Sequence, residues 1–573
     1  MRRSLGVLAL AVAVAAGCDR SSSPTATADP LVVLITVDAF RSDLASGGFA
    51  RLAGGGTRYG HAWSVSAMSR PALATVMTGS APDRTGVRSD VLDVLPEGLP
   101  TLASRFRDRG WTTAAIVGNQ IASHVSGLDR GFELFDGPES LQVGPAAHAP
   151  TFVESKVLAE RFASWLGSRP ADRPAFVWLH LGDLHSAAPA VQAASDPMTD
   201  YQWTMERLDQ GLDAIAGALA SARGGDAAEV VLVGLYGVGT GDPYPAGAKY
   251  WLNDDTLRAT VLWKAGGASS VPLPPPDAEL WLPDVPQILL ARHGLAPFPD
   301  ADGFAWIPGA GAPTRTIRAW NWALDDDLAW STQSAVRHDG AWDVFEHERI
   351  AAPRDPEDSA ALSVARERPA TPRVRQLSEN TRARLEALDI RTSPADVPGS
   401  RVVPEDRDAF LMDVLRVRRG LSFGNAIAAR KTSRRLEEAA PDNVAVLSDI
   451  AYFASIGGAD DEALARARRA LELYPDREAA VHQAAHAEIA RRDLERGEAL
   501  LAAVRDLGGV EADVRYDEAC VLALRGDVAG SVAALEGAIQ AGYRSWVNLE
   551  ADPDLAAIRS DPAYAELLRR HGR

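Results

Sequence analysis

The stretch LVVLITVDAF, residues 31–40, places an unbroken run of apolar and β-branched residues directly before an aspartate, Asp38. Such a run is typical of a strand that is buried on both faces of a parallel sheet. Comparable runs recur further along, and amphipathic stretches separate them, at residues 113–117, 176–181, 229–235 and 259–263. The pattern predicts an α/β fold, with a mostly parallel sheet and helices on both faces.

Functional groups in such folds collect beyond the carboxyl ends of the strands. Two stretches offer polar side chains there: Asp38 after the first run, and the sequence HLGDLH at the end of the third. The latter contributes His180, Asp183 and His185. Because His180 lies inside the apolar run itself, a histidine satisfied within the core is expected at that position.

Length and charge limit the possibilities further. A chain of 573 residues is too long for one hydrophobic core, so two or three domains are expected. Its net charge is -18, and a phosphate backbone repels so acidic a protein, which argues against a nucleic acid partner.

The N-terminus, MRRSLGVLALAVAVAAGC, has the two arginines, short apolar run and small-residue exit of a secretory signal. Its end resembles a bacterial lipobox, which predicts a lipoprotein signal peptide over residues 1–18 and a lipid on Cys18. Ordinary cleavage near the same position is the alternative. Polar residues 19–30 suit a flexible tether, so we expect an exported protein anchored to a bacterial membrane and facing the periplasm or cell surface.

Small residues recur at a 34-residue period in the last third of the chain. One series is Ala451, Ala485 and Ala519, and a second is Ala463, Gly497 and Ser531, with Ala429 in the matching place of an earlier unit. This period resembles the tetratricopeptide repeat, an all-α solenoid of stacked helix pairs that binds proteins. An unrelated helical bundle is the alternative. The repeat reading predicts that Cys520 is buried.

Several segments of the first part resemble the sulfatase family of the alkaline phosphatase superfamily. They are, in collinear order, LITVDAFRSDLASGG, the segment from 96 to 120, GLDRGFELFD, FVWLHLGDLH, LNDDTLRATVLW and LPDVPQILLARHGL, with LSENTRARLEALDI (377–390) as the end of the family domain. The resemblance implies a sulfatase-like domain over 31–390, a linker over 391–409 and a repeat domain over 410–573.

The resemblance also implies roles for three residues. Asp38 matches the first metal-binding aspartate, Ser69 in SRPALATVMTG matches the nucleophile, and His185 matches a histidine that faces the ester. A metal neutralises the charge of a sulfate or phosphate ester and helps to activate the nucleophile. An active site would therefore need a divalent cation: calcium, zinc or manganese.

The same comparison reveals departures from the family pattern. In VVLVGLYGVGTGDP (230–243), Leu235 and Tyr236 stand where sulfatases carry a metal-binding aspartate and histidine, and Leu73 replaces an arginine near the nucleophile. Asp242, in the following turn, is a possible replacement ligand, although turns commonly carry aspartate for their own geometry. Loss of such ligands predicts a metal site that has been dismantled, with no cofactor.

Structural alternatives exist for the surviving residues. Asp38 can cap the helix after the first strand, and Ser69 can be a helix N-cap with Pro71 in the first turn. Arg41, Arg70 and Arg88 lie on segments expected to rim the cleft, where guanidinium groups would suit sulfate or phosphate.

Three functions remain open from the sequence. The first is a pseudoenzyme, whose sulfatase-like domain serves as a scaffold or binding module beside a repeat array that recruits a protein. The second is an active hydrolase or transferase of sulfuric or phosphoric esters with an altered site. The third is a domain that binds sulfated or phosphorylated glycans without cleaving them.

Overall fold

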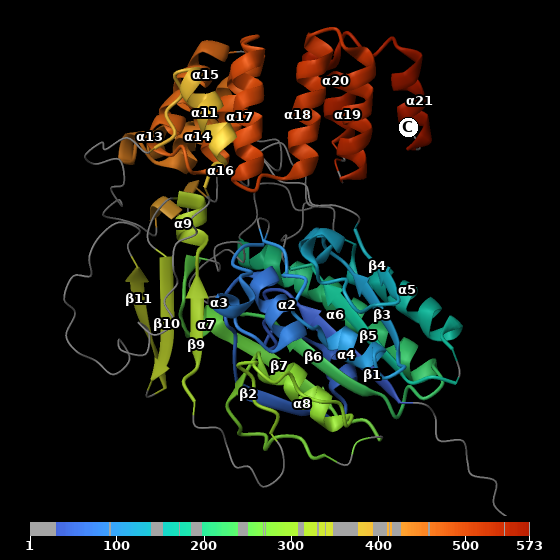
Figure 1. The fold of residues 1–573 in the computed structure, drawn as a ribbon. Helices are drawn as coiled ribbons and strands as arrows, with labels where there is room; N and C mark the ends of the chain where they lie inside the picture. The colour runs from blue at the N-terminus through green and yellow to red at the C-terminus, as the bar shows by residue number, and fades with distance from the viewer. Residues whose placement is uncertain are drawn as a thin grey trace, which may run out of the picture.

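The computed structural model describes the chain in two units, an α/β unit and a helical unit (Figure 1). It describes residues 30–90, 93–138, 153–170, 172–184, 197–238, 250–267, 269, 271–306, 315–328, 332–338, 340–347, 376–393, 409–411, 413–414, 417, 426–456, 459–541, 543 and 545–571. The predicted signal peptide, Cys18 and almost all of the tether lie outside these ranges. No helix in the described ranges is long and apolar enough to cross a membrane.

The core of the α/β unit is an eight-stranded sheet in the order β4-β3-β5-β1-β6-β7-β2-β8. The first five strands in this order are parallel to one another. Four of them match the predicted apolar runs, and they are fully buried because helices cover both faces: β1 (Leu31–Val37), β3 (Thr112–Val117), β5 (Ala175–Leu181) and β6 (Glu229–Gly234). The predicted fold class is confirmed.

The other edge of the sheet is partly antiparallel. The predicted run 259–263 forms β7 (Arg258–Lys264), which pairs antiparallel with both β6 and β2 (Thr57–Trp63). The sequence did not indicate β2, β4 (Leu134–Asp136) or β8 (Leu280–Trp281). A second, antiparallel sheet comprises β9 (Arg318–Asn321), β10 (Thr332–His338) and β11 (Ala341–His347).

Two groups of helices cover the main sheet (Figure 1). One group packs together as α1 (Gly47–Ala53), α5 (Ser155–Ser168) and α6 (Pro197–Ser221), and the other as α2 (Ser69–Thr78), α4 (Leu102–Arg107) and α8 (Asp284–Arg292). Shorter helices are α3 (Pro82–Thr85), α7 (Asp254–Leu257) and α9 (Ala323–Leu328), with 3-10 turns η1 (Gln120–Ala122) and η2 (His124–Ser126).

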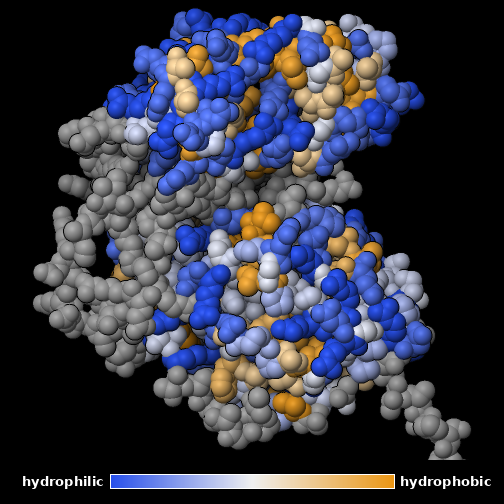
Figure 2. All heavy atoms as spheres, viewed as in Figure 1, coloured by the Kyte–Doolittle hydropathy of each residue, from blue (hydrophilic) through white to orange (hydrophobic). Residues whose placement is uncertain are grey.

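The helical unit is a row of helices in which sequence neighbours pack against each other (Figure 1). Its members are α13 (Ala426–Ala439), α14 (Val444–Ile456), α15 (Asp460–Leu473), α16 (Glu478–Ala490), α17 (Leu494–Asp506), α18 (Glu511–Leu524), α19 (Val528–Gln540), α20 (Trp546–Ala551), η4 (Pro553–Leu555) and α21 (Pro562–Arg570). Hydrophilic residues cover much of its visible face (Figure 2).

The periodic small residues lie at close contacts between these helices. All six members of the two series are buried, and each successive helix from α14 to α19 carries one of them. Ser531 on α19 donates its hydroxyl proton to the Ala519 carbonyl oxygen on α18, 2.8 Å away. A Cβ added to Gly497 would lie 2.6 Å from Cγ1 of Ile489. Cys520 is buried, as the register predicted.

The segment 377–390 packs with a different unit from the one predicted, the sulfatase-like domain. It forms α11 (Glu379–Ala387), but Leu377, Leu385 and Ile390 lie in the apolar core of the helical unit. The helix packs on α17, and the Ser378 backbone N–H donates to Asp506 Oδ2 at 2.8 Å. These residues, expected to close the sulfatase-like domain, are thus packed with the helical unit.

A shared apolar cluster joins the two units. From the α/β unit it takes Met68, Tyr250 and residues of α9, and from the helical unit residues between Phe410 and Phe453. Asn443 Nδ2 also donates to the Leu328 carbonyl oxygen at 3.2 Å. Met68 immediately precedes α2, so this interface reaches the start of the helix that carries Ser69.

Candidate functional site

The turn after β1 lies between the carboxyl ends of β5 and β6. The Asp38 N–H donates to the Leu181 carbonyl, and the Phe40 N–H donates to the Tyr236 carbonyl. Between them, Ala39 has a φ of 48°, a left-handed conformation that costs energy for a residue with a Cβ. The Tyr201 hydroxyl stabilises this turn by donating to the Ala39 carbonyl at 2.6 Å and accepting from the Arg41 N–H at 3.1 Å.

The Asp38 carboxylate is fully buried at the centre of this region. Its Oδ2 accepts a hydrogen bond from Asn119 Nδ2 at 2.9 Å and lies 3.5 Å from His180 Nε2. His180 Nδ1 in turn is 2.9 Å from Thr36 Oγ1, so this histidine is held within the core, as predicted. These contacts with Asn119 and His180 hold the Asp38 carboxylate inside the protein.

Ser69 is the first residue of α2, and the N-cap position belongs to Met68, one residue earlier. Ser69 is therefore the first helical residue and not the N-cap that the sequence suggested as an alternative. Its Oγ is buried and lies 3.1 Å from the Tyr236 hydroxyl oxygen. Burial and the nearby Asp38 carboxylate raise the pKa of Tyr236 well above its ordinary value, so the phenol stays neutral.

Leu235 and Tyr236 are part of the main apolar core. Their exposed fractions are 0% and 4%, and Leu73 is equally buried. An additional Cβ at Gly234 would lie 3.0 Å from Cβ of Phe40, which shows how tightly this strand end packs on the turn after β1. The three residues that depart from the family pattern, Leu235, Tyr236 and Leu73, are thus all packed in the core.

The three arginines expected at a cleft rim have other contacts. Arg41 makes a two-point ion pair with Asp43, and the Arg88 guanidinium lies over the Trp322 ring, 5.3 Å from its centroid. Arg70 is only 1% exposed and donates to the backbone carbonyls of Ile121 and Asp93. Burial lowers the Arg70 pKa to about 10, against the opposing effect of Asp90 and Asp93. Arg70 therefore lies in the interior, not on a rim.

His185 and Asp242 lie outside the described residues. Their predicted roles stay predictions. Asp183, two residues before His185, is buried, and its Oδ1 accepts the Ser155 N–H at the start of α5, 3.1 Å away. Burial raises the pKa of Asp183.

Two residues of this region were missed from the sequence, Asn119 and Tyr201. Asn119 also caps the short turn η1 through its Oδ1 while its amide nitrogen reaches Asp38. The only sequence signal for Asn119 is its place just after the apolar run 113–117, the same rule that identified Asp38. Tyr201 lies in the long helix α6, and nothing in its local sequence indicates a contact with the turn after β1.

A pair of substitutions measures how strongly the two phenols hold this region. We expect Tyr236→Phe to cost about 0.5–1.5 kcal/mol, since one hydrogen bond to Ser69 is lost and the ring stays in place. Tyr201→Phe should cost more, because its hydroxyl serves two backbone groups of a strained turn. Urea denaturation of both variants checks the order; a larger loss for Tyr236→Phe would contradict it.

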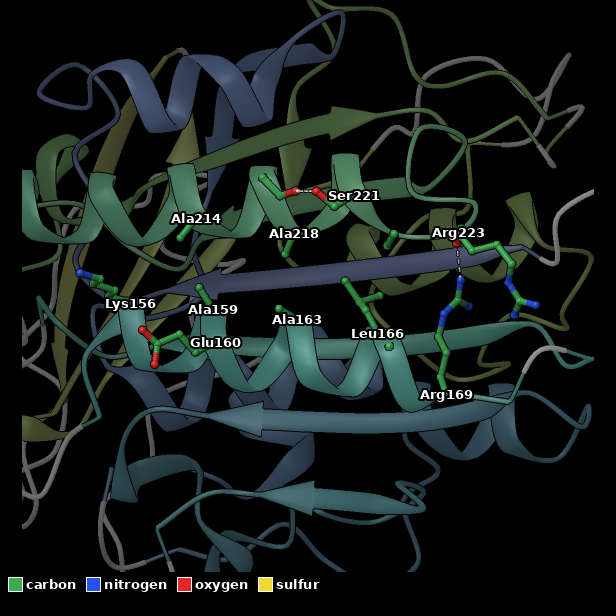
Figure 3. Close-up of a pocket in the computed structure, with 13 residues that line it drawn as sticks. Lys156, Ala159, Glu160, Ala163, Leu166, Arg169, Ala214, Ala218, Ser221 and Arg223 are labelled. Carbon is green, nitrogen blue, oxygen red and sulfur yellow. Dashed lines mark hydrogen bonds between the residues drawn. The ribbon is translucent and has the colours of Figure 1, made fainter.

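A groove of about 700 Å³ lies elsewhere, between α5 and α6 (Figure 3). Small side chains such as Ala159, Ala163 and Ala218 line its floor, and Arg169 donates to the Arg223 carbonyl oxygen at one end. It runs along the outside of the helices and contains no cluster of groups that could act together in catalysis.

Part of the chain is similar to known proteins. Residues 30–267 match the sulfatase family model. No curated protein matches the chain. Similar solved structures include a candidate sulfatase from Bacteroides thetaiotaomicron (16% identity, TM-score 0.44, 56% of this chain and 85% of that one). Others are a 2-O GAG sulfatase (14%, 0.42, 56% and 85%) and the phosphonate monoester hydrolase of Agrobacterium radiobacter (14%, 0.39, 56% and 89%).

The mostly parallel sheet, with its polar side chains gathered at the carboxyl edge, defines an α/β protein whose polar groups lie where such folds place functional groups. The α/β part of this chain is similar to the sulfatase family over residues 30–267.

Proposed function

We propose that this protein is a sulfatase-family pseudoenzyme: its α/β unit is a binding or scaffold domain without ester hydrolase activity. The observation that carries the proposal is the burial of Leu235 and Tyr236 in the apolar core at the metal-ligand positions. The helical unit would recruit a protein partner, and a lipid on Cys18 would hold the protein at the membrane. Stacked helix pairs with small residues at their contacts support the partner-binding role.

Among the described residues, the groups that contact Asp38 do not fit a divalent cation. Asn119 presents an amide N–H to the carboxylate, which is the contact of an anion with a donor rather than with a metal. Within the described ranges, the one group of three acidic, cysteine or histidine side chains with converging ligand atoms is in the helical unit, not here.

The described contact of Ser69 is with a neutral phenol. A serine hydroxyl needs an adjacent base or a metal to become a strong nucleophile. Its neighbour Tyr236 is a phenol whose pKa is raised further by burial. Near neutral pH the phenol is therefore protonated and forms a hydrogen bond, and it does not act as a base. The contact fits packing better than catalysis.

The test is an activity assay on the full chain with aryl sulfates and phosphate mono- and diesters, after incubation with zinc, calcium or manganese. We expect no turnover above buffer, and identical results for the wild type and Ser69→Ala. Turnover that disappears in Ser69→Ala, with a metal ion lost in Asp38→Asn, would establish the active hydrolase instead.

A further inference from the structure

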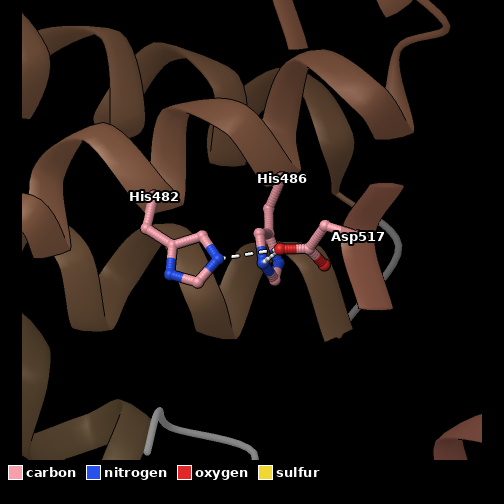
Figure 4. A group of neighbouring side chains, drawn as sticks. All are labelled: His482, His486 and Asp517. Atoms are coloured by element: carbon pink, nitrogen blue, oxygen red, sulfur yellow. Dashed lines mark hydrogen bonds and ion pairs between the residues drawn. The ribbon is translucent and has the colours of Figure 1, made fainter. Parts of the chain in front are cut away.

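A histidine and carboxylate cluster lies on adjacent helices of the helical unit, far in sequence from the sulfatase-family domain (Figure 4). Glu478, His482 and His486 follow at four-residue intervals on α16 and so share one face of that helix. Asp517 faces them from α18.

The two imidazoles and the carboxylate converge on one point. Asp517 Oδ2 lies 2.8 Å from His482 Nε2 and 2.9 Å from His486 Nε2. The two rings are 4.7 Å apart at an angle of 82°, and the three ligand atoms all lie within 4.8 Å of one another. Small rotations of these side chains would let one ion lie about 2.0–2.1 Å from both nitrogens and about 2.0–2.2 Å from the oxygen.

Glu478 orients the first of these histidines. His482 Nδ1 is 3.1 Å from Glu478 Oε1, so a proton on Nδ1 is donated to this carboxylate and the Nε2 lone pair is left for a ligand bond. The same carboxylate–histidine arrangement fixes the ring in many metal sites. His486 is 47% exposed, whereas Asp517 is 8% exposed, so an ion can enter from solvent on the His486 side.

We propose that His482, His486 and Asp517 bind one divalent transition-metal ion, zinc being the best match. Imidazole nitrogen with a single carboxylate suits zinc, while calcium and magnesium require mostly oxygen ligands. Three protein ligands leave a fourth position for water or for a side chain of a bound partner. The site depends on none of the residues around Asp38, so it stands or falls independently of the pseudoenzyme proposal. The competing interpretation is an ion pair in which a protonated His482 bridges the two carboxylates.

The experiment is a zinc titration of the full chain by calorimetry after treatment with a chelator. We expect one zinc ion per chain, and at least a 100-fold loss of affinity in His486→Gln and in Asp517→Asn. His124→Gln is the matched control: His124 is 48% exposed and also pairs with an aspartate, Asp129, but it belongs to no group of three converging ligands among the described residues. Its zinc affinity should equal that of the wild type.

Two further measurements separate binding from folding. Glu478→Gln removes only the orienting carboxylate, so we expect a loss of affinity of about 10–100-fold. Cobalt in place of zinc should give the visible absorption of a tetrahedral ion in the wild type and lose it in His486→Gln. His486→Gln should keep the melting temperature of the metal-free wild type, because the side chain is largely exposed. Absence of zinc binding, or one zinc bound equally well by His486→Gln and wild type, would overturn the proposal in favour of the ion pair.

Discussion

Glu229→Gln is expected to cost about 3–5 kcal/mol of folding free energy, because it leaves a buried arginine without its charge partner. Glu229 is 1% exposed at the start of β6. Its carboxylate accepts from both Arg292 and the Trp263 indole N–H, and lies 3.2 Å from His293 Nε2. The α8 end is thereby fixed to the central sheet, so urea denaturation should show a large fall in the midpoint.

Glu279→Gln is the control, since Glu279 also accepts from an indole N–H and an arginine, those of Trp63 and Arg337. Its side chain is 51% exposed, and surface pairs of this kind contribute about 0–1 kcal/mol. Equal losses in the two variants would contradict the role given to burial.

The effect of Glu229 also predicts a pH dependence. Burial alone would raise its pKa, but hydrogen bonds from His293 and Arg292 outweigh burial and lower the pKa to about 2, below the ordinary 4.5. Because the folded-state pKa is the lower one, the stabilisation is complete above about pH 4.5 and disappears as the pH falls through about 2. The stability difference between wild type and Glu229→Gln should therefore narrow over this interval. A difference that stays constant would show that the charge is not the cause.

Ala485→Trp should destabilise the helical unit by about 1–3 kcal/mol or more, because α16 has no room for an indole at this contact. Ala485 is fully buried. The corresponding small residues on the neighbouring helices make close contacts, Gly497 with Ile489 and Ser531 with Ala519. Ala479→Trp is the control, as this alanine is exposed on the first turn of the same helix. The melting temperature, measured by circular dichroism, should fall for Ala485→Trp and not for Ala479→Trp. An unchanged melting temperature would contradict the repeat register.

The sequence predicted the central strands well because each buried strand is a continuous run of apolar residues. The continuous runs that became β1, β3, β5 and β6 need no distant partner to be identified. By contrast, β2 is half-exposed and interrupted by Gly60, and β8 has only two residues, so neither gives a periodic signal. The place of α11 was also missed, since its packing on α17 depends on a contact more than 100 residues away.

The candidate site was predictable in its parts and not in its contacts. Asp38 and His180 follow from the rule for strand ends, and Leu235 and Tyr236 from the departure from the family pattern. The contacts that define the site, Asn119 with Asp38 and Ser69 with Tyr236, join residues 81 and 167 positions apart. Such pairings are set by the tertiary fold and have no local sequence signal.

The shared apolar cluster at the junction of the two units predicts what happens when the units are separated. Phe410, Leu411, Val446 and Phe453 are buried against Met68, Tyr250 and Leu324 of the α/β unit. Cleavage within the predicted linker, followed by separation of the halves, would expose this apolar surface on both fragments and favour their aggregation. We therefore expect that neither the α/β unit nor the helical unit folds stably without the other. Heat should then unfold both units in one transition rather than in succession.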